Sequence, residues 1–537
     1  MNQTLAILSM LHESATHNSA LLRFRQRPVI AWTLDRIAQI PQAPAIRIFA
    51  WTDQLEALAR ALPTDVKVVD AGPRRSIGLI ETVSAARRWS DGWRGGILGT
   101  TAFDSGFQPH LTLEMLNQLS ADAALLINPA DGLIDPALLR GLLDHAADHP
   151  AAEMCFLQAP PGLAGAFLRR TLVERLARVN LHPGRLLHYL PDQPARDPLA
   201  GEGCAPVPLV VARSSESLRL DSVTHIAKIE HATMHLNGQL IHTEAEALLE
   251  TLRSGRRHVS VTRDVRLEIT TRRTCRPVFD PMQHVDLKRD DLSLDSFNRW
   301  LSAQSAPSDL RITFVGTGDP LLHPELPAML LAARSAGVRA IAIETDLLSA
   351  PDDVLGALVT HAVDIVSIHL PATSPQVYEK VMGVNGMGTV LANLKRLIEL
   401  RMAAGRHLPL IVPTFIKLEQ NLGDMEAWYD QWMRAVGWAV IKGPTDYAAQ
   451  MPRLSVADMS PPKRSSCRRL TDSFTILSNG AITACEEDVL GVQALGHVGA
   501  PDAQGLRHRL QQLLDDHHAG RWSAHRLCGA CTEWHRS

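Results

Sequence analysis

The sequence predicts an α/β protein of more than one domain, and three observations carry this prediction. Strand-like and helix-like segments alternate along residues 1–236 and again along residues 263–455. Four of the seven cysteines lie further on, in residues 467–531, around a predicted β-hairpin. At 537 residues the chain is also too long for a single hydrophobic core.

Composition and charge narrow the functional classes. Hydrophobic residues make up 45% of the chain and charged residues 21%, which is typical of a globular protein. The formal net charge of −3 argues against a nucleic-acid partner. No apolar run reaches the roughly 20 residues that span a bilayer, and the start does not have the pattern of a signal peptide. Clustered cysteines favour a reducing compartment, so we expect a cytoplasmic protein.

Residues 1–236 are predicted to form a doubly wound α/β domain. Strands that alternate with helices favour a sheet covered by helices on both faces. One helix is predicted with particular clarity, because Asp135 can act as its N-cap and Pro136 can take its first position. The expected strands are 5–11, 46–51, 66–71 and 121–128, and the expected helices are 28–40, 53–62 and 135–149.

Three segments of this domain resemble the cytidylyltransferases that make CMP-activated sugars, enzymes with a GT-A-like nucleotidyltransferase fold. They are QRPVIAWTLDRI (26–37), INPADGLIDPALLRGLL (127–143) and LRLDSVTHIAKI (218–229). The phosphate-binding loop of that family would be HESATHNSALLRF (12–24), which has no glycine and no lysine to hold a triphosphate. The family has two metal-binding aspartates. The first position falls on Ala130, with Asp131 one residue out of register, and the second falls on Asp221. We therefore expect a retained scaffold or binding module.

A linker is expected over residues 237–262, with a helix that ends at Ser254-Gly255 and a basic turn after it. The middle domain, residues 263–455, then repeats strand–helix units. Such units indicate parallel strands in a closed or partial (β/α) barrel, whose ligands bind at the carboxyl ends of the strands. The expected strands are 265–270, 311–316, 339–345, 363–370, 408–416 and 439–443.

The middle domain resembles the radical S-adenosylmethionine (SAM) superfamily. Residues 363–400 follow that family's fifth-strand region, and VGTGDPLLHPEL (315–326) is similar to its GGEPLL segment. The resemblance implies a SAM-binding turn in which Asp319 would contact the amino group of the methionine moiety. The four residues on this motif are Thr317, Gly318, Asp319 and Pro320.

The same resemblance shows a missing cluster motif. Arg273, Pro277 and Asp280 take the three cysteine positions of the family's CxxxCxxC sequence. Arginine has no lone pair to offer and proline has no side-chain donor, so a barrel of this sequence is not expected to cleave SAM by the usual route. Cys275 lies between these positions, and a single cysteine is more often a small core residue. The alternative is a metal site made of Cys275, Asp280 and His284.

Residues 460–537 carry the strongest chemical signal. Cys467 and Cys485 flank SFTILSNGAITA (473–484), a predicted hairpin turning at Asn479-Gly480, and Cys528 and Cys531 form a CxxC pair. Two such pairs brought together make a four-thiolate site, which suits zinc or an iron–sulfur cluster. The segment resembles the short form of the SPASM domain, which implies one 4Fe–4S cluster on these four cysteines. Zinc is the alternative.

The three parts in this order resemble the spiro-SPASM type of protein. The resemblance implies a pseudoenzyme, a cluster-bearing binding or electron-relay component that works with a partner enzyme or on a peptide or glycan substrate. Two alternatives remain open. One is an active radical SAM enzyme with non-standard cluster ligands, and the other is a sugar-nucleotide cytidylyltransferase with a structural metal site. Because this chain lacks expected site residues of both families that it resembles, the sequence does not decide whether the chain is an enzyme.

Overall fold

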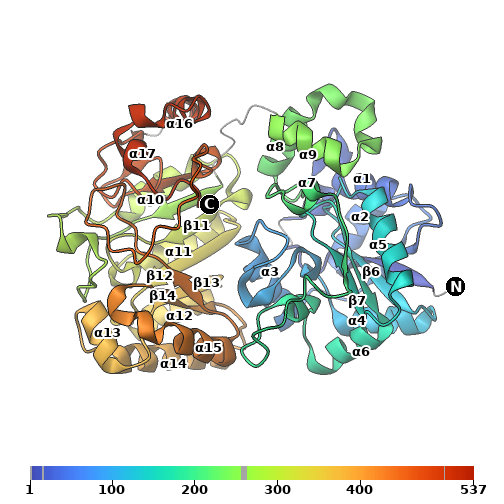
Figure 1. Cartoon of the computed structure of the whole chain (residues 1–537), viewed down its shortest axis with the longest axis horizontal. Helices are drawn as coiled ribbons and strands as arrows, with labels where there is room; N and C mark the ends of the chain where they lie inside the picture. Colours follow the sequence, from blue (N-terminus) through green and yellow to red (C-terminus); the bar gives the residue numbers. More distant parts are fainter. Residues whose placement is uncertain (1–2, 15–16, 255–262, 501, 537) are drawn as a thin grey trace. The chain divides into compact units, whose positions relative to one another are not determined.

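The computed structural model of the chain describes residues 3–14, 17–254, 263–500 and 502–536, and divides the chain into two compact units, 1–256 and 257–537 (Figure 1). Both units are mixed α/β with largely parallel sheets, as the alternation of strands and helices predicted. The basic turn expected after Ser254 lies outside the described residues.

The first unit is built on a seven-stranded sheet of order β5-β4-β1-β6-β8-β7-β9. Strands β1, β4, β5 and β6 are parallel, and β8 runs antiparallel to both β6 and β7. The chain adds β4 and β5 on one side of β1 and β6 on the other, so the strand order reverses at β1. The strands are β1 (Thr4–Ser9), β4 (Ala45–Ala50), β5 (Lys67–Asp70), β6 (Ala123–Ile127), β7 (Met154–Leu157), β8 (Ala166–Arg169) and β9 (Cys204–Ala205).

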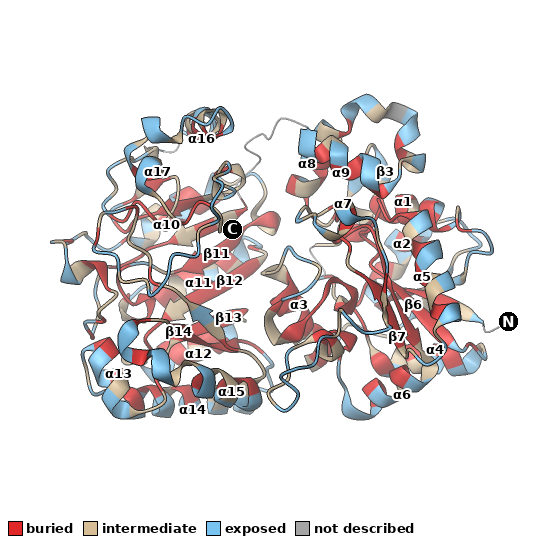
Figure 2. Cartoon of the chain, in the orientation of Figure 1, coloured by how far each residue is buried: buried red, intermediate tan, exposed pale blue. Residues whose placement is uncertain are grey.

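Helices cover both faces of this sheet, and each face has its own core. Ala6 and Leu8 of β1 pack in one core, whereas Leu5 and Ile7 pack in the other, because successive strand side chains point to opposite faces. The first core contains buried residues of α1 (Val29–Ile37), α2 (Leu55–Ala61), α5 (Pro136–Asp148), α8 (Val223–Ala232) and α9 (Ala245–Ser254), and the second contains those of α3 (Gly78–Arg88), α4 (Pro109–Gln118) and α6 (Arg170–Val179). Figure 2 shows the buried strands between helices whose outer sides are exposed.

The helix expected in the linker is part of the first unit. Leu248, Leu249 and Leu252 of α9 are buried in the first of these two cores. The backbone N–H of Ala245 donates to Asp135 Oδ2 at 2.5 Å, while Asp135 Oδ1 accepts the N–H groups of Ala137 and Leu138. Asp135 is therefore the predicted N-cap of α5 and also fixes the start of α9. The segment predicted as a linker, 237–262, thus contributes a core helix.

The second unit contains a nine-stranded sheet of order β15-β14-β13-β12-β11-β10-β16-β17-β18. From β10 to β15 every strand is parallel to the next one along the chain, and helices α10 to α15 connect them. The strands are β10 (Asp264–Leu267), β11 (Arg311–Phe314), β12 (Ala340–Thr345), β13 (Ile365–His369), β14 (Leu410–Ile416) and β15 (Val440–Lys442). The helices are α10 (Leu294–Ser302), α11 (Leu326–Ser335), α12 (Asp352–Thr360), α13 (Pro375–Met382), α14 (Met387–Ala403) and α15 (Met425–Val436).

The last segment of the chain extends the same sheet. Strand β16 (Ser473–Ile476) pairs in parallel with β10, and it forms the predicted hairpin with β17 (Ala481–Thr483), which pairs with β18 (Gly496–His497). Phe474, Ile476 and Leu510 pack in one continuous core with the strands of the parallel sheet. The two helices of this segment are α16 (Ala503–His518) and α17 (Arg526–Ala530). Residues 460–537, predicted as a separate small domain, share both sheet and core with the preceding residues.

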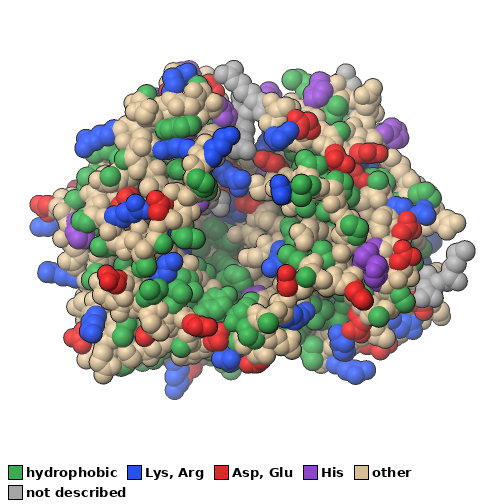
Figure 3. All heavy atoms as spheres, in the orientation of Figure 1, with side chains coloured by type: hydrophobic (Ala, Val, Ile, Leu, Met, Phe, Trp, Pro, Cys, Tyr) green, Lys and Arg blue, Asp and Glu red, His purple; other side chains and the backbone are tan. Residues whose placement is uncertain are grey.

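The outer surfaces carry charges of both signs. Figure 3 shows Lys and Arg side chains interspersed with Asp and Glu side chains on the visible face of each unit. In the described part of the chain, no helix combines the length and the apolar character that crossing a membrane requires.

Candidate functional sites

One face of the second unit's sheet carries ionised side chains. Arg266 alternates along β10 with the core residues Val265 and Leu267, so it lies on the face opposite the core. There Glu344 Oε1 is 3.4 Å from Arg266 Nη2 and 3.1 Å from Lys442 Nζ. Burial by itself would raise the pKa of Glu344, but the two cations hold it well below its usual value. This face therefore holds a stable carboxylate between cations from β10 and β15.

The three positions predicted to replace the cluster cysteines are brought together after β10. The guanidinium of Arg273 donates to both oxygens of Asp346, with two distances of 2.7 Å, and its Nη1 is 3.6 Å from Asp280 Oδ2. The N–H of Asp280 donates to the carbonyl of Pro277 at 2.9 Å. Asp346 also lies 2.9 Å from Nδ1 of His369. These three positions thus lie in and around a buried ion pair.

The thiol of Cys275 takes part in this ion network. Its Sγ donates to Asp346 Oδ2 at 3.1 Å, and the side chain is buried. Burial and then the charge of Asp346 raise the pKa of Cys275 far above its usual value, so the thiol keeps its proton. Among the residues that the structure describes, no three His, Cys, Asp or Glu side chains are placed to hold a metal ion. This covers the alternative site of Cys275, Asp280 and His284, and it also covers the four cysteines of residues 467–531 as they are positioned here.

The turn predicted to bind SAM is held by the protein's own groups. Thr317 donates to Glu268 Oε2 through its N–H (3.0 Å) and its hydroxyl (2.8 Å). A side chain at Gly318 would come within 2.4 Å of the carbonyl oxygen of Thr270, so only glycine fits there. Pro320 begins a short 3₁₀ helix, Pro320–Leu322, that follows the turn. The turn is therefore rigid before any ligand arrives.

Asp319 is the buried acid of that turn. Its carboxylate accepts hydrogen bonds from the hydroxyl of Thr345 at 2.8 Å, the N–H of Asp346 at 3.1 Å and the N–H of Leu321 at 3.0 Å. Burial and the neighbouring charge of Asp346 raise the pKa of Asp319 to about 6. These three donors fix the carboxylate at the carboxyl end of β12. The predicted contact with a methionine amino group stays a prediction.

The four cysteines of the predicted thiolate site come from three segments of the second unit. Cys467 precedes β16, and Cys485 follows β17 by two residues. Cys528 lies in α17, and Cys531 follows that helix as its C-cap. All four are partly buried. Two of the cysteines therefore flank the hairpin and two belong to the short helix and its end, and their convergence on one metal stays a prediction.

Cys467 is electrostatically close to the other three cysteines. Burial is the largest cause of the raised pKa of Cys528, about 11, and of Cys531, about 12, and the Cys467 thiol adds to both. The pKa of Cys485 is raised for the same reasons, with Glu487 as a further cause. Metal binding would have to displace these protons, as it does at thiolate sites in general. Metal ligation itself stays a prediction.

Two arginines supply positive charge beside these thiols. Arg469 lies two residues after Cys467, and its Nη1 is 3.1 Å from Glu487 Oε1. Its charge lowers the pKa of Cys485 against the larger effect of burial. Arg464 donates to the carbonyl oxygen of Cys528. Sequence reasoning missed both arginines, because their spacing from Cys467 does not reveal which carboxylates or carbonyls they meet.

The sulfur atoms of the four cysteines are the kind of ligand that the predicted cluster requires. In a four-iron cluster each thiolate binds a different iron, whereas the ligands of a zinc ion meet at one point. A cluster with four thiolates carries net negative charge, and buried charge requires compensation. Arg464 would supply part of that compensation, whereas the charge of Arg469 is shared with Glu486 and Glu487. These four cysteines would hold the cluster.

The two aspartate positions of the first unit also lie near each other. The N–H of Leu220 donates to the carbonyl of Ala130 at 3.0 Å, which brings Asp221 beside the loop after β6. Asp131 Oδ1 accepts from Nε of the buried Arg219 at 3.2 Å. Burial raises the pKa of Asp131, while Arg219 lowers it. One of the two carboxylates is therefore already neutralised by the protein.

The loop that stands where the resembling family has its phosphate-binding loop contains a buried carboxylate. Burial would raise the pKa of Glu13, but His12 and a hydrogen bond from Ser19 help to lower it to about 2. A buried anion at this position repels a triphosphate, because phosphate loops work through cations and backbone N–H groups. Residues 15 and 16 of this loop lie outside the described part of the chain.

Two curated proteins show sequence similarity to this chain, and no protein-family model matches it. An uncharacterized protein of Treponema pallidum (strain Nichols) is 26% identical over 231 residues, which is 41% of this chain and 62% of that protein. A tungsten-containing aldehyde ferredoxin oxidoreductase cofactor-modifying protein of Pyrococcus furiosus is 27% identical over 156 residues, 29% of this chain and 44% of the relative. The chain thus spans less than two thirds of the length of either relative.

Solved structures similar to this chain include two that contain S-adenosylmethionine. The structure of BtrN in complex with AdoMet and 2-DOIA shares 13% identity and a TM-score of 0.34, over 50% of this chain and 92% of BtrN. The structure of SuiB of Streptococcus suis bound to S-adenosylmethionine shares 14% sequence identity and a TM-score of 0.39. The match covers 54% of this chain and 77% of SuiB. A cytidylyltransferase from Leptospira borgpetersenii shares 13% sequence identity and a TM-score of 0.32. That match covers 47% of this chain and 93% of the cytidylyltransferase.

Proposed function

We propose that the second unit is a radical SAM-like barrel that has lost SAM cleavage by the usual route and carries one 4Fe–4S cluster on Cys467, Cys485, Cys528 and Cys531. The observation that carries this proposal is the ion pair between Arg273 and Asp346. Its guanidinium occupies the first position of the missing cysteine motif, and Asp346 also binds Cys275, the one thiol near that motif.

The four cysteines are the residues of this unit whose type and number suit a cluster. Cys467 lies close enough to the other three cysteines to affect the pKa of each. When bound, a cluster with four protein thiolates transfers electrons and does not present an open iron to a substrate. The chain would therefore act as a cluster-bearing binding or electron-relay component.

A role as the binding or electron-relay component of another enzyme has separate support. The relative from Pyrococcus furiosus is named as a protein that modifies the cofactor of another enzyme. In the first unit, Asp131 is paired with Arg219 and the loop at Glu13 carries an anion, which favours a scaffold or a binding module over a working transferase. A peptide or glycan substrate, or a partner enzyme, fits such a role.

An anaerobic preparation of the full chain tests this proposal. Iron and acid-labile sulfide near four per chain are expected, with the absorbance of a 4Fe–4S cluster. Iron near eight per chain would show a second cluster and would overturn the loss of the first motif. Zinc without iron would overturn the cluster and establish the alternative four-thiolate site. SAM added with a reductant is expected to yield no 5′-deoxyadenosine.

A further inference from the structure

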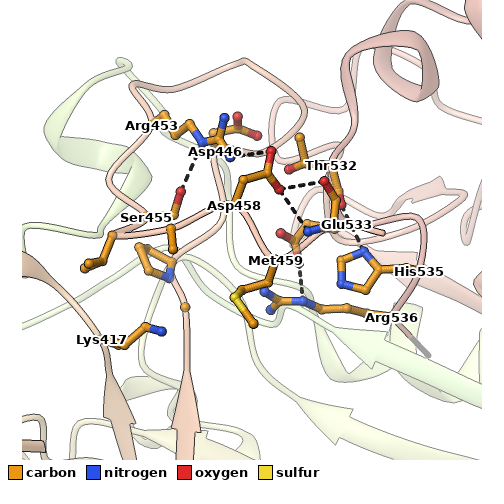
Figure 4. A pocket seen from close by; sticks show the side chains of 15 residues that line it. Lys417, Asp446, Arg453, Ser455, Asp458, Met459, Thr532, Glu533, His535 and Arg536 are labelled. Carbon is orange, nitrogen blue, oxygen red and sulfur yellow. Dashed lines mark hydrogen bonds and ion pairs between the residues drawn. The ribbon is translucent and has the colours of Figure 1, made fainter. Parts of the chain in front are cut away.

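A pocket of the second unit lies at the carboxyl ends of β14 and β15 (Figure 4). Lys417 directly follows β14, and Gly443 and Pro444 follow β15. Segments 453–460 and 532–536 supply the remaining walls. Part of this space is open to solvent. Ligands bind at this end of parallel strands in many α/β folds, because loops and side chains converge there.

Most of the charge in the pocket is compensated internally. Arg453 Nη2 is 2.9 Å from Asp458 Oδ2, and Arg536 Nε is 2.5 Å from Glu533 Oε2. Asp446 Oδ1 accepts the N–H of Ala449 at 3.2 Å, within the loop that follows β15. The two arginines therefore already have carboxylate partners and offer little further charge to a ligand.

Lys417 is the exception among the cations of this pocket. In the described part of the chain its ammonium has no hydrogen-bond or ion-pair partner, and its side chain is half-buried. Figure 4 shows its amino group directed toward the same hollow as Arg536 and Met459. A partly desolvated ammonium in a concave site attracts an anionic group, because the local dielectric is lower than in water.

The rim beside this cation is apolar. Met459 is 69% exposed and Val456 is 41% exposed, and both line the pocket. No Phe, Tyr or Trp side chain is among the lining residues. An ammonium pairs with a carboxylate or a phosphate as a point charge. The carboxylates of Asp446, Asp458 and Glu533 line the same pocket and repel a doubly charged phosphate more strongly than a singly charged carboxylate. The ligand chemistry is then a carboxylate next to an aliphatic group.

We propose that this pocket binds the free C-terminal carboxylate of a peptide whose last residues are aliphatic, with the carboxylate at Lys417 and the aliphatic side chains at Val456 and Met459. The pocket adjoins the thiolate site, because Glu533 lines it and donates its N–H to Sγ of Cys531 at 3.3 Å. A peptide of this kind would be the substrate or partner of the function proposed above. Binding of the peptide does not depend on that function, but the role of the bound peptide does.

Fluorescence anisotropy with the full-length protein tests the proposal. The probe is a fluorescein-labelled six-residue peptide that ends in Val-Leu, compared with the same peptide amidated at its C-terminus. The free acid should bind at least about tenfold more tightly, which is the effect of one charge interaction of ordinary strength. Lys417→Met should remove this preference, and Lys417→Arg should restore it. Lys395→Met, on an exposed side chain of α14 that pairs with Glu399, should leave it unchanged.

Three results would overturn the inference: equal binding of acid and amide, unchanged binding by Lys417→Met, or stronger competition by galacturonic acid than by the unlabelled peptide. The last result would assign the site to an acidic sugar. Iron is counted in the same preparations. Full iron without peptide binding overturns this inference alone, whereas peptide binding without iron overturns the proposed cluster alone.

Discussion

Arg273 and Asp346, which are 73 residues apart in sequence, form a two-point ion pair in the interior of the second unit. Only 6% of the Arg273 side chain and 1% of the Asp346 side chain are exposed. Burial by itself would raise the pKa of Asp346, but Arg273 and His369 hold it far below the usual value. The pair therefore stays ionised at neutral pH.

Arg273→Met is expected to lower the free energy of unfolding by about 3–5 kcal/mol, because it leaves the Asp346 charge buried without its main partner. Chemical denaturation measures this loss. Arg272→Met is the matched control, since Arg272 pairs with Asp291 at the surface and its side chain is 52% exposed; a change of at most about 1 kcal/mol is expected. Equal effects of the two substitutions would contradict the structural role of the pair.

Asp319 should make stability depend on pH in a defined window. Its pKa in the folded protein is about 6, above the ordinary value of 3.8, so the folded state holds a proton that the unfolded state loses between these values. The free energy of unfolding should therefore fall as the pH rises from about 4 to about 6, by about 2–3 kcal/mol. Asp319→Asn should remove this dependence of the unfolding free energy on pH. Asp290→Asn, at an exposed position, should leave it unchanged.

Cys485→Ala is expected to abolish the visible absorbance of the cluster and to lower the Tm of the second unit, because bound metal contributes to folding. Cys275→Ala is the matched control within the same unit. Its thiol binds Asp346 and keeps its proton, so the absorbance should persist. Loss of absorbance in both variants would show that Cys275 ligates iron.

Arg469→Gln should weaken the thiolate site without touching a cysteine. The side chain of Arg469 is 12% exposed and pairs with Glu486 and Glu487, so its loss leaves two carboxylates near the thiols. A decrease of about 2–4 kcal/mol in unfolding free energy is expected, together with faster loss of iron to a chelator. Arg468→Gln removes an exposed neighbouring charge and should change neither measurement.

The position of α9 predicts where the first unit can be cut. A fragment of residues 1–254 should fold, as judged by a cooperative thermal transition, because it retains Leu248, Leu249 and Leu252 in the core. A fragment of residues 1–236 should not show that transition, since burial of each leucine contributes about 1.5–3 kcal/mol. Asp135→Ala in the longer fragment should cost at least about 1 kcal/mol, because Asp135 caps α5 and holds the start of α9.

Local patterns were sufficient to predict much of each unit. The cap at Asp135, the hairpin that turns at Asn479-Gly480 and the buried strand β6 were all readable from short stretches of sequence. Each depends on neighbours within a few residues, such as a side chain that accepts from the next turn of the helix. The boundary between the units was harder to predict, because the apolar face of α9 does not indicate which core it joins.

The sequence by itself determined that the chain is α/β and that four cysteines lie around and after a hairpin. That Arg273, Pro277 and Asp280 replace a cysteine motif stays a prediction from a resemblance. Only the tertiary structure decided that β16 pairs with β10 and that Arg273 meets Asp346. Lys417 likewise became notable only when the pocket around it was known. The physical reason is that strand edges, ion pairs and pockets form between segments far apart in sequence. Their energies depend on burial and on partners that no local pattern specifies.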